Sequence, residues 1–195
     1  MAESSGASRW RHLPNILTIA RLVLALPIAF TVAWGHFSSG LILAILAGAS
    51  DALDGFLARR FHWQSRLGAI LDPLADKLLL MGCFIALSWV GAVPLALTLI
   101  VLARDVLIVG GVLLWRWKIG VLHVQPSMLS KLNTTAQILY VLIVLALLAT
   151  QRPLTLIGPD WAVAALTIAS GVDYILRWGW RARRDLRIRR RNHGI

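Results

Sequence analysis

Residues 50–80 read SDALDGFLARRFHWQSRLGAILDPLADKLLL, and this stretch places four aspartates among leucines and alanines. They are Asp51, Asp54, Asp72 and Asp76. A carboxylate is costly in apolar surroundings unless a cation or hydrogen-bond donors accompany it. The spacing of these acids, and the length of the apolar runs around them, therefore indicate both how the chain folds and what it binds.

Apolar residues dominate the whole chain. They make up 58% of its 195 residues, well above the share in ordinary soluble domains. Runs of about 20 apolar residues, enough to cross a hydrocarbon layer about 30 Å thick as a helix, recur along it. Six such runs are expected, at residues 16–34, 41–58, 69–90, 93–115, 128–149 and 154–176. They predict an all-α integral membrane protein built as a six-transmembrane-helix bundle, with a leader (1–14), one helical domain (15–178) and a basic tail (179–195).

The basic residues predict the orientation of this bundle. Six crossings place both termini on one side of the membrane. Arginine and lysine gather in the leader, in the tail and in the loops after the second and fourth runs, whereas the other loops contain only Arg152. By the positive-inside rule the termini are cytoplasmic. The net charge of +11 is then an orientation signal that contacts anionic lipid, and no nucleic-acid partner is expected. The leader is either a short interfacial helix or disordered.

Helical spacing places the acids on two helix faces. Positions i, i+3, i+4, i+7 and i+8 share one face of the first helix, and positions four apart share one face of the next. These positions are filled by Asp51, Asp54, Gly55, Ala58 and Arg59, then by Gly68, Asp72 and Asp76. Because a short polar loop joins the two helices, they should be antiparallel neighbours whose acidic faces converge at the cytoplasmic end.

Converging carboxylates need positive charge nearby, because like charges at short range oppose one another. Two sources are available. Arg59 and Lys77 could pair with the acids as in an ordinary buried ion pair, or metal ions could neutralise them. The small residues opposite the acids leave room for a ligand, which favours the metal. An all-oxygen ligand set suits hard divalent ions such as Mg²⁺, Mn²⁺ or Ca²⁺.

The same residues resemble the signature of the CDP-alcohol phosphatidyltransferases, D-x2-D-G-x2-A-R-x8-G-x3-D-x3-D. All eight fixed positions are matched, including the eight-residue gap. The segments PNILTIARLVLALP (14–27) and DPLADK (72–77) resemble the glycerol-type branch of this family. That branch includes phosphatidylglycerophosphate synthases and cardiolipin synthases of the CDP-alcohol type. The six-helix fold of the family agrees with the count from hydropathy and charge.

The resemblance implies a definite reaction. Members transfer a phosphatidyl group from CDP-diacylglycerol to an alcohol and release CMP, in phospholipid biosynthesis. It implies two divalent cations, Mg²⁺ or Mn²⁺, bound by Asp51, Asp54, Asp72 and Asp76, with Asp76 also the general base. It implies a nucleotide site formed by Asp51, Gly55, Ala58, Arg59 and Gly68. It also implies a homodimer in a bacterial-type inner membrane or its equivalent, with the active site facing the cytoplasm.

The acceptor is less constrained. An acceptor phosphate requires cations, and those available near the acids are Arg21, Arg104, Arg116 and Lys131. Arg104 could equally be paired with Asp105, and SKLNTTAQ (130–137) could be a helix cap followed by interhelical hydrogen bonds. By resemblance, ARDV (103–106) and SKLNT slightly favour phosphatidylglycerol as acceptor, as in a cardiolipin synthase, over glycerol 3-phosphate.

A protein of another class could use the same acids. A divalent-cation transporter would place carboxylates near the middle of the membrane on several helices, with a polar path beyond them. Here the four acids lie on two adjacent helices, and the outer halves of the apolar runs are mainly apolar. A scaffold whose acids only pair with arginines is the third alternative. The spacing favours the transferase over both.

Overall fold

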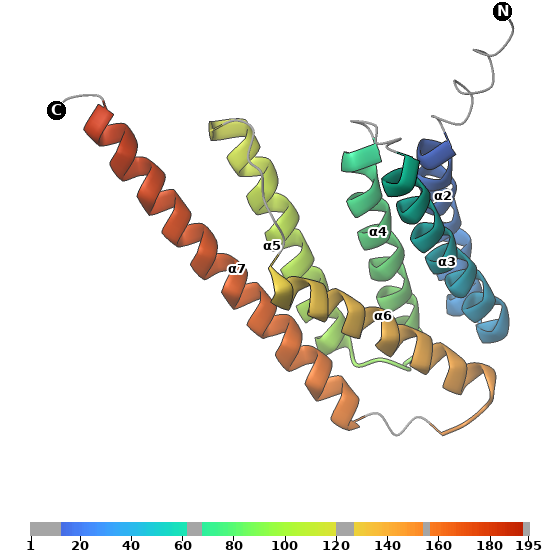
Figure 1. Ribbon diagram of the computed structural model, residues 1–195. Coiled ribbons are helices and arrows are strands. Elements are labelled where there is room, and N and C mark those ends of the chain that lie inside the picture. Colours follow the sequence, from blue (N-terminus) through green and yellow to red (C-terminus); the bar gives the residue numbers. More distant parts are fainter. Residues whose placement is uncertain (1–12, 62–67, 120–126, 154–156, 193–195) are drawn as a thin grey trace, which may run out of the picture. The chain divides into compact units, whose positions relative to one another are not determined.

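The computed structural model describes residues 13–61, 68–119, 127–153 and 157–192. Within these ranges the chain forms six helices and no strand. They are α2 (Leu13–Ala33), α3 (Phe37–Phe61), α4 (Gly68–Trp89), α5 (Leu95–Ile119), α6 (Met128–Ala149) and α7 (Ile157–Asn192) (Figure 1). The predicted all-α class is therefore confirmed for the described residues.

Each expected apolar run corresponds to one helix, and the bounds of α6 are those expected. The largest difference is in α7, which has 36 residues and continues to Asn192, well into the basic tail. No proline follows Pro159, and arginine and leucine are good helix formers, so nothing ends the helix at the edge of the apolar run. Residues 1–12 of the leader, expected to form a short interfacial helix or to be disordered, lie outside the described residues, and residues 13 and 14 already belong to α2.

The helices fall into two compact units. The first unit contains α2, α3, α4, the start of α5 up to Thr98, and the part of α6 from Ile138 onward. The second unit contains α5 from Leu99, α6 up to Gln137, and α7.

In the first unit, α2 packs against both α3 and α4. The contact with α4 is close, because a Cβ added at Gly82 would lie 3.5 Å from the Cβ of Ala29. Ile28, Phe84 and Leu87 are fully buried in this core. Figure 1 shows α3 and α4 running in opposite directions, with the end of α3 and the start of α4 at the same end of the unit. α3 and α4 are thus antiparallel, as expected.

A tight turn connects α2 to α3. Gly35 has φ 80°, a conformation that glycine adopts without steric cost. The backbone N–H groups of Gly35 and His36 donate to the carbonyls of Val32 and Thr31, at 3.0 and 2.8 Å. These bonds satisfy carbonyls that the end of α2 leaves without helical partners. The turn holds the start of α3 against α2.

The second unit has a polar core. Six polar or charged side chains are buried on its three helices: Arg104, Asp105, Asn133, Gln137, Thr167 and Ser170. Such groups are stable inside a protein only when they bond to one another or to a ligand. The bonds among them therefore decide whether this core is satisfied by the protein's own groups.

By length and composition, one described helix, Met128–Ala149, is long and apolar enough to cross a membrane. Two shorter segments, Leu22–Ala33 and Phe37–Leu53, are also apolar.

Candidate functional site

All eight residues of the aspartate motif lie on two helices. Asp51, Asp54, Gly55, Ala58 and Arg59 lie on α3, and Gly68, Asp72 and Asp76 lie on α4. Gly68 is the first residue of α4, and Arg59 lies two residues before the end of α3. The motif therefore occupies the second half of α3 and the first half of α4, the helix parts on either side of residues 62–67.

The side chains of Asp51 and Asp76 are half-buried. The side chains of Asp54 and Asp72, and those of Ala58 and Arg59, lie outside the part that the structure describes. Within that part, no group of three or more histidine, cysteine, aspartate or glutamate side chains could hold a metal ion. Because half of the predicted ligands fall outside this comparison, the convergence of the four carboxylates stays a prediction.

The chemistry of the motif nevertheless fits a hard divalent cation. Its four acids supply only oxygen atoms, and the softer sulfur donors on α4 are Met81 and Cys83, five and seven residues after Asp76. Cys83 is buried, seven residues after Asp76 and hence about two helical turns away along α4. The donor set is thus the one that Mg²⁺ and Mn²⁺ prefer.

The second unit contains a buried arginine that binds all three of its helices. Arg104 on α5 is 4% exposed, and its Nη1 donates to Oδ1 of Asp105 at 2.6 Å. Its Nη2 donates to the hydroxyls of Ser130 on α6, at 2.7 Å, and Ser170 on α7, at 3.0 Å. The side-chain stem passes Gly171, where a Cβ would lie 3.7 Å from the Cγ of Arg104. The pairing of Arg104 with Asp105 is confirmed, and Nη2 links α6 to α7.

A second set of hydrogen bonds continues along α6 and α7. Gln137 donates from Nε2 to Oγ1 of Thr167 at 3.1 Å, and Thr167 donates from the same hydroxyl to Oδ1 of Asn133 at 2.9 Å. All three side chains are fully buried. Together with Ser130, these bonds confirm that SKLNTTAQ makes interhelical hydrogen bonds.

The partners on α7 were not singled out from the sequence. Thr167 and Ser170 interrupt the last apolar run with a spacing of three, which places both on one helix face, and Gly171 adjoins them. This repeated polar spacing was the available signal. The hydroxyl of Tyr174, one turn farther along α7, donates to the backbone carbonyl of Ile108 at 3.1 Å and ties α7 to α5 again.

The other predicted acceptor cations are dispersed over the helices. Arg21 lies on α2 in the first unit, and Arg116 lies on α5 in the second; both side chains are outside the described part. Lys131 lies on the first turn of α6 and is exposed. It directly follows Ser130, which Arg104 contacts. The role of Arg21, Arg116 and Lys131 as cations that bind the acceptor phosphate stays a prediction.

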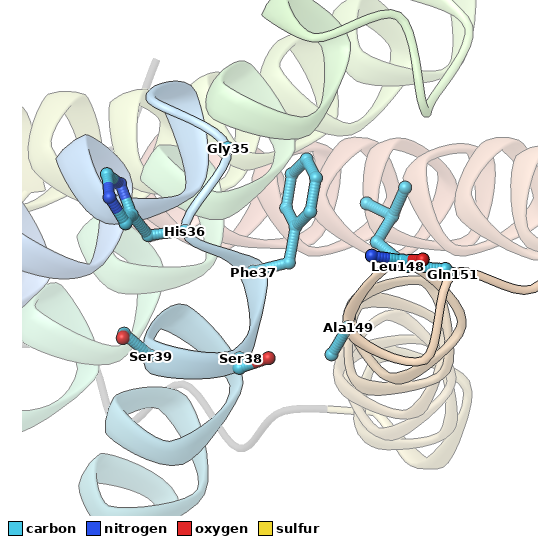
Figure 2. Close-up of a pocket in the computed structure, with 8 residues that line it drawn as sticks. All are labelled: Gly35, His36, Phe37, Ser38, Ser39, Leu148, Ala149 and Gln151. Atoms are coloured by element: carbon cyan, nitrogen blue, oxygen red, sulfur yellow. The ribbon is translucent and has the colours of Figure 1, made fainter.

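A cavity of about 360 Å³ lies in the first unit at the turn between α2 and α3 (Figure 2). It is lined by Gly35, His36, Phe37, Ser38, Ser39, Leu148, Ala149 and Gln151. Asp51 lies 14 residues after Phe37, or about 21 Å farther along α3 at 1.5 Å per residue. The cavity is therefore at the opposite end of α3 from the aspartate motif and is separate from it.

Comparison with known proteins identifies the class. Residues 11–175 match the model of the CDP-alcohol phosphatidyltransferase family, and the chain belongs to this family. The match includes the aspartate motif on α3 and α4 and the polar core of the second unit. The resemblance inferred from the motif is thereby confirmed.

Individual relatives carry two kinds of name. The chain is 33% identical to the chloroplastic CDP-diacylglycerol–glycerol-3-phosphate 3-phosphatidyltransferase 1 of Oryza sativa subsp. japonica, over 91% of this chain and 60% of that protein. It is 32% identical to the cardiolipin synthase (CMP-forming) of Rattus norvegicus, over 72% of this chain and 51% of that protein. It is 32% identical to the CDP-diacylglycerol–glycerol-3-phosphate 3-phosphatidyltransferase of Bacillus subtilis, over 88% of this chain and 96% of that protein. The chain thus spans about half to nearly all of the length of these relatives.

Proposed function

We propose that this protein transfers a phosphatidyl group from CDP-diacylglycerol to a glycerol-type acceptor and releases CMP. The observation that carries the proposal is the complete eight-residue motif on the successive helices α3 and α4. Both kinds of relative named above support it, since their names describe transfer to a glycerol unit or release of CMP. Family membership favours this transferase over a cation transporter.

We also propose that the helices span a membrane. Large apolar side chains are exposed on all of them, for example Val23, Leu26 and Phe30 along one face of α2, at 62%, 65% and 55%. A soluble monomer rarely exposes such a contiguous face, whereas lipid covers it at no cost. Exposed tryptophans lie at helix ends, at Trp34, Trp89 and Trp161, where membrane proteins place their interfacial aromatic residues. Both termini and the aspartate motif are then on the cytoplasmic side.

The aspartates are proposed to bind two divalent cations, Mg²⁺ or Mn²⁺. When bound, such ions neutralise the pyrophosphate of the nucleotide-lipid and the charge that develops on its oxygens. Asp51, Asp54, Asp72 and Asp76 would hold them. Gly55, Ala58 and Gly68 have small side chains and would let the cytidine nucleotide approach the backbone, with Asp51 and Arg59 beside it.

Asp76 is proposed to act as the general base. It would accept the proton of the attacking acceptor hydroxyl, while the new O–P bond forms to the phosphorus that carries the lipid and the P–O bond to CMP breaks. Its carboxylate is half-buried on α4 and lies one helical turn from Asp72. A base of this kind works through position rather than basicity, because it must reach the hydroxyl at hydrogen-bond distance.

For the acceptor, we propose phosphatidylglycerol slightly ahead of glycerol 3-phosphate. Both present a glycerol unit next to a phosphate, and relatives of both descriptions match this chain. Arg21, Arg104, Arg116 and Lys131 are the cations proposed for that phosphate. Phosphatidylglycerol is placed ahead because the segments ARDV and SKLNT resemble those of the cardiolipin synthases of the CDP-alcohol type.

The test is release of CMP by the full-length protein, purified and reconstituted with CDP-diacylglycerol and Mg²⁺ or Mn²⁺. CMP should appear only when an acceptor is added. Parallel assays with phosphatidylglycerol and with glycerol 3-phosphate then show which of the two is the acceptor. Removal of the metal with a chelator should stop the reaction, and added Mg²⁺ should restore it. Absence of CMP with either acceptor in a folded preparation would refute the proposed reaction.

The Asp76→Asn variant tests the assigned base. Asparagine keeps the shape of the side chain but cannot take up a proton, so turnover should fall at least about 100-fold, the usual contribution of a general base. Binding of CDP-diacylglycerol, measured by calorimetry, should remain within a few-fold of the unmodified protein. Asp160→Asn, on the first turn of α7 far along the chain from the motif, is the matched control and should keep full turnover.

A further inference from the structure

The basic end of α7 extends far beyond the apolar segment of this helix. α7 runs without interruption from Ile157 to Asn192, and Figure 1 shows it as one straight helix. Its apolar segment, residues 157–176, is about 29 Å long at 1.5 Å per residue, which matches the hydrocarbon thickness of about 30 Å without a tilt. Residues 178–192, here called the basic arm, therefore leave the membrane as a continuation of α7.

The basic arm carries positive charge at high density. Its sequence contains one acid, Asp185, and seven arginines. They are Arg181, Arg183, Arg184, Arg187, Arg189, Arg190 and Arg191. Like charges four positions apart on a helix repel each other, and Arg183, Arg187 and Arg191 have this spacing. An anionic partner would relieve this repulsion.

A straight helix holds most of this charge away from the lipid. Arg177, just before the arm, is already paired, because it donates to Asp173 at 2.6 Å. Arg191 lies 14 residues after Arg177, about 21 Å farther along the helix axis. Salt screens the attraction between charges beyond about 8 Å at physiological ionic strength. The distal arginines of a straight arm therefore contribute little to contact with a membrane surface.

The sequence of the arm contains what it needs to lie on the lipid instead. Gly179 stands at its base, and glycine is the residue that, after proline, weakens the interior of a helix most. Ala182 and Leu186 are four positions apart and share one helix face, whereas Arg183 and Arg187 share the neighbouring face. A helix with an apolar and a basic face is suited to the surface of an anionic membrane.

The size of the competing effects makes this contact depend on lipid charge. An arginine close to an anionic leaflet strengthens binding about fivefold, and the arm has seven. A bend costs two or three helical hydrogen bonds, each of which changes the equilibrium by a similar factor of about five. Leu186 and Ile188, the large aliphatic residues of the arm, are two positions apart and lie on different faces. Charge therefore outweighs the bend on an anionic leaflet, and apolar contact alone does not outweigh it on a neutral one.

We propose that the basic arm senses the anionic lipid content of the cytoplasmic leaflet. On neutral lipid it projects into the water as the straight end of α7. On anionic lipid it bends at Gly179 and lies on the headgroups. A lipid surface is favoured over a soluble polyanion, because α7 anchors the arm beside the leaflet at high effective concentration. The inference rests on the proposed membrane-spanning arrangement and is independent of the transferase reaction.

A fluorophore at the end of the arm measures its position. Full-length protein with Cys83→Ala and Asn192→Cys is labelled and placed in phosphatidylcholine vesicles with or without phosphatidylserine, both containing a lipid with a quencher on its headgroup. In neutral vesicles quenching should be weak, because a straight helix holds residue 192 about 22 Å beyond Arg177. Phosphatidylserine should increase quenching at least about fivefold. NaCl at about 1 M should remove the increase, because the screening length falls to about 3 Å.

Matched variants separate lipid charge from a specific contact. The positions to be replaced together are Arg187, Arg189, Arg190 and Arg191. Glutamine at all four should abolish the increase in quenching, whereas lysine at all four should keep it, because lysine retains the charge. Gly179→Ala should lower the ratio of docked to straight arm about fivefold, since alanine favours the uninterrupted helix.

The outcomes are distinct. Equal quenching with and without phosphatidylserine, or an increase that survives in the glutamine variant, would refute the proposal. Loss of the increase in the lysine variant would show a contact specific for guanidinium groups, such as a site on a protein or nucleic acid, and would equally refute it. Gly179→Ala that docks like the unmodified protein would overturn the bend. Failure of the proposed function is seen separately, as absence of CMP release by the same protein.

Discussion

At the scale of single residues, the pairing of Arg104 with Asp105 is the most consequential contact outside the aspartate motif. Both side chains are at most 4% exposed, and the two residues are adjacent on α5. Two charges removed from water attract each other strongly, but each loses its hydration, so the pair as a whole adds little stability. Loss of one partner alone is strongly destabilising, because it leaves an unpaired charge in the core.

We therefore expect Asp105→Asn and Arg104→Gln each to lower the free energy of unfolding by about 3–5 kcal/mol. The double replacement Arg104→Met with Asp105→Leu, which removes both charges, should lose much less. Thermal unfolding of the purified variants in detergent measures all three.

An exposed ion pair of the same unit provides the control. Arg177 donates to Asp173 at 2.6 Å, but its side chain is 62% exposed. An exposed pair of this i, i+4 kind contributes less than about 1 kcal/mol. Arg177→Gln should therefore hardly change the unfolding temperature. Equal losses for Arg177→Gln and Arg104→Gln would contradict the buried-pair account.

Individual residues also show where prediction from the sequence stopped. The pattern assigned Asp51, Asp54, Asp72 and Asp76 to two successive helices, and the structure confirms both helices, because apolar length and a spacing of three or four are local signals. It left Arg104 open between an ion pair and a phosphate ligand, because spacing does not tell which helix a side chain meets. The bonds from Arg104 to Ser130 and Ser170 span 26 and 66 residues, and no local rule predicts contacts of such range.

At the scale of helices, small residues decide how closely neighbours pack. Gly82 brings α4 against α2, whereas a Cβ added at Gly48 on α3 would have nothing within 4 Å. The two glycines are thus a matched pair, each inside a helix but only one at a contact. Gly82→Ala introduces only ordinary van der Waals contact at 3.5 Å and gains the better helix propensity of alanine.

A leucine at the same places separates the two environments. Gly82→Leu should force α2 and α4 apart and cost about 1–3 kcal/mol, the usual penalty of overpacking. Gly48→Leu should be neutral or mildly stabilising. Unfolding in a denaturing detergent, followed by circular dichroism, gives the comparison. If both leucine variants behave alike, the close contact of α2 with α4 is wrong.

The positions of the helices could be predicted because the length of an apolar run is almost sufficient to indicate a membrane-spanning helix. The bounds of α6 agree with the expected run, and α3 and α4 differ from theirs by a few residues at the ends. The extension of α7 was missed, because the tail from residue 179 onward was interpreted by its charge. Charge indicates the side of the membrane, but a helix ends only where proline, glycine or a cap ends it.

At the scale of the whole molecule, the remaining question is the orientation of the chain in the membrane. The basic residues place both termini in the cytoplasm, and the cavity at His36 and Gln151 lies at the end of the first unit opposite to the aspartate motif. If the orientation is right, that cavity faces the outside and CDP-diacylglycerol meets the acids from the cytoplasm, where nucleotides are present.

Single cysteines test this orientation. In a Cys83→Ala background, His36→Cys and Gln151→Cys should react with a membrane-impermeant maleimide on intact bacterial cells that express the protein. Met128→Cys, at the exposed start of α6, and Asn192→Cys, at the end of α7, should react only after the cells are permeabilised. The background protein without cysteine is the control for labelling of other proteins. Labelling of Asn192→Cys on intact cells, or of all four sites alike, would overturn the orientation and with it the cytoplasmic position of the active site.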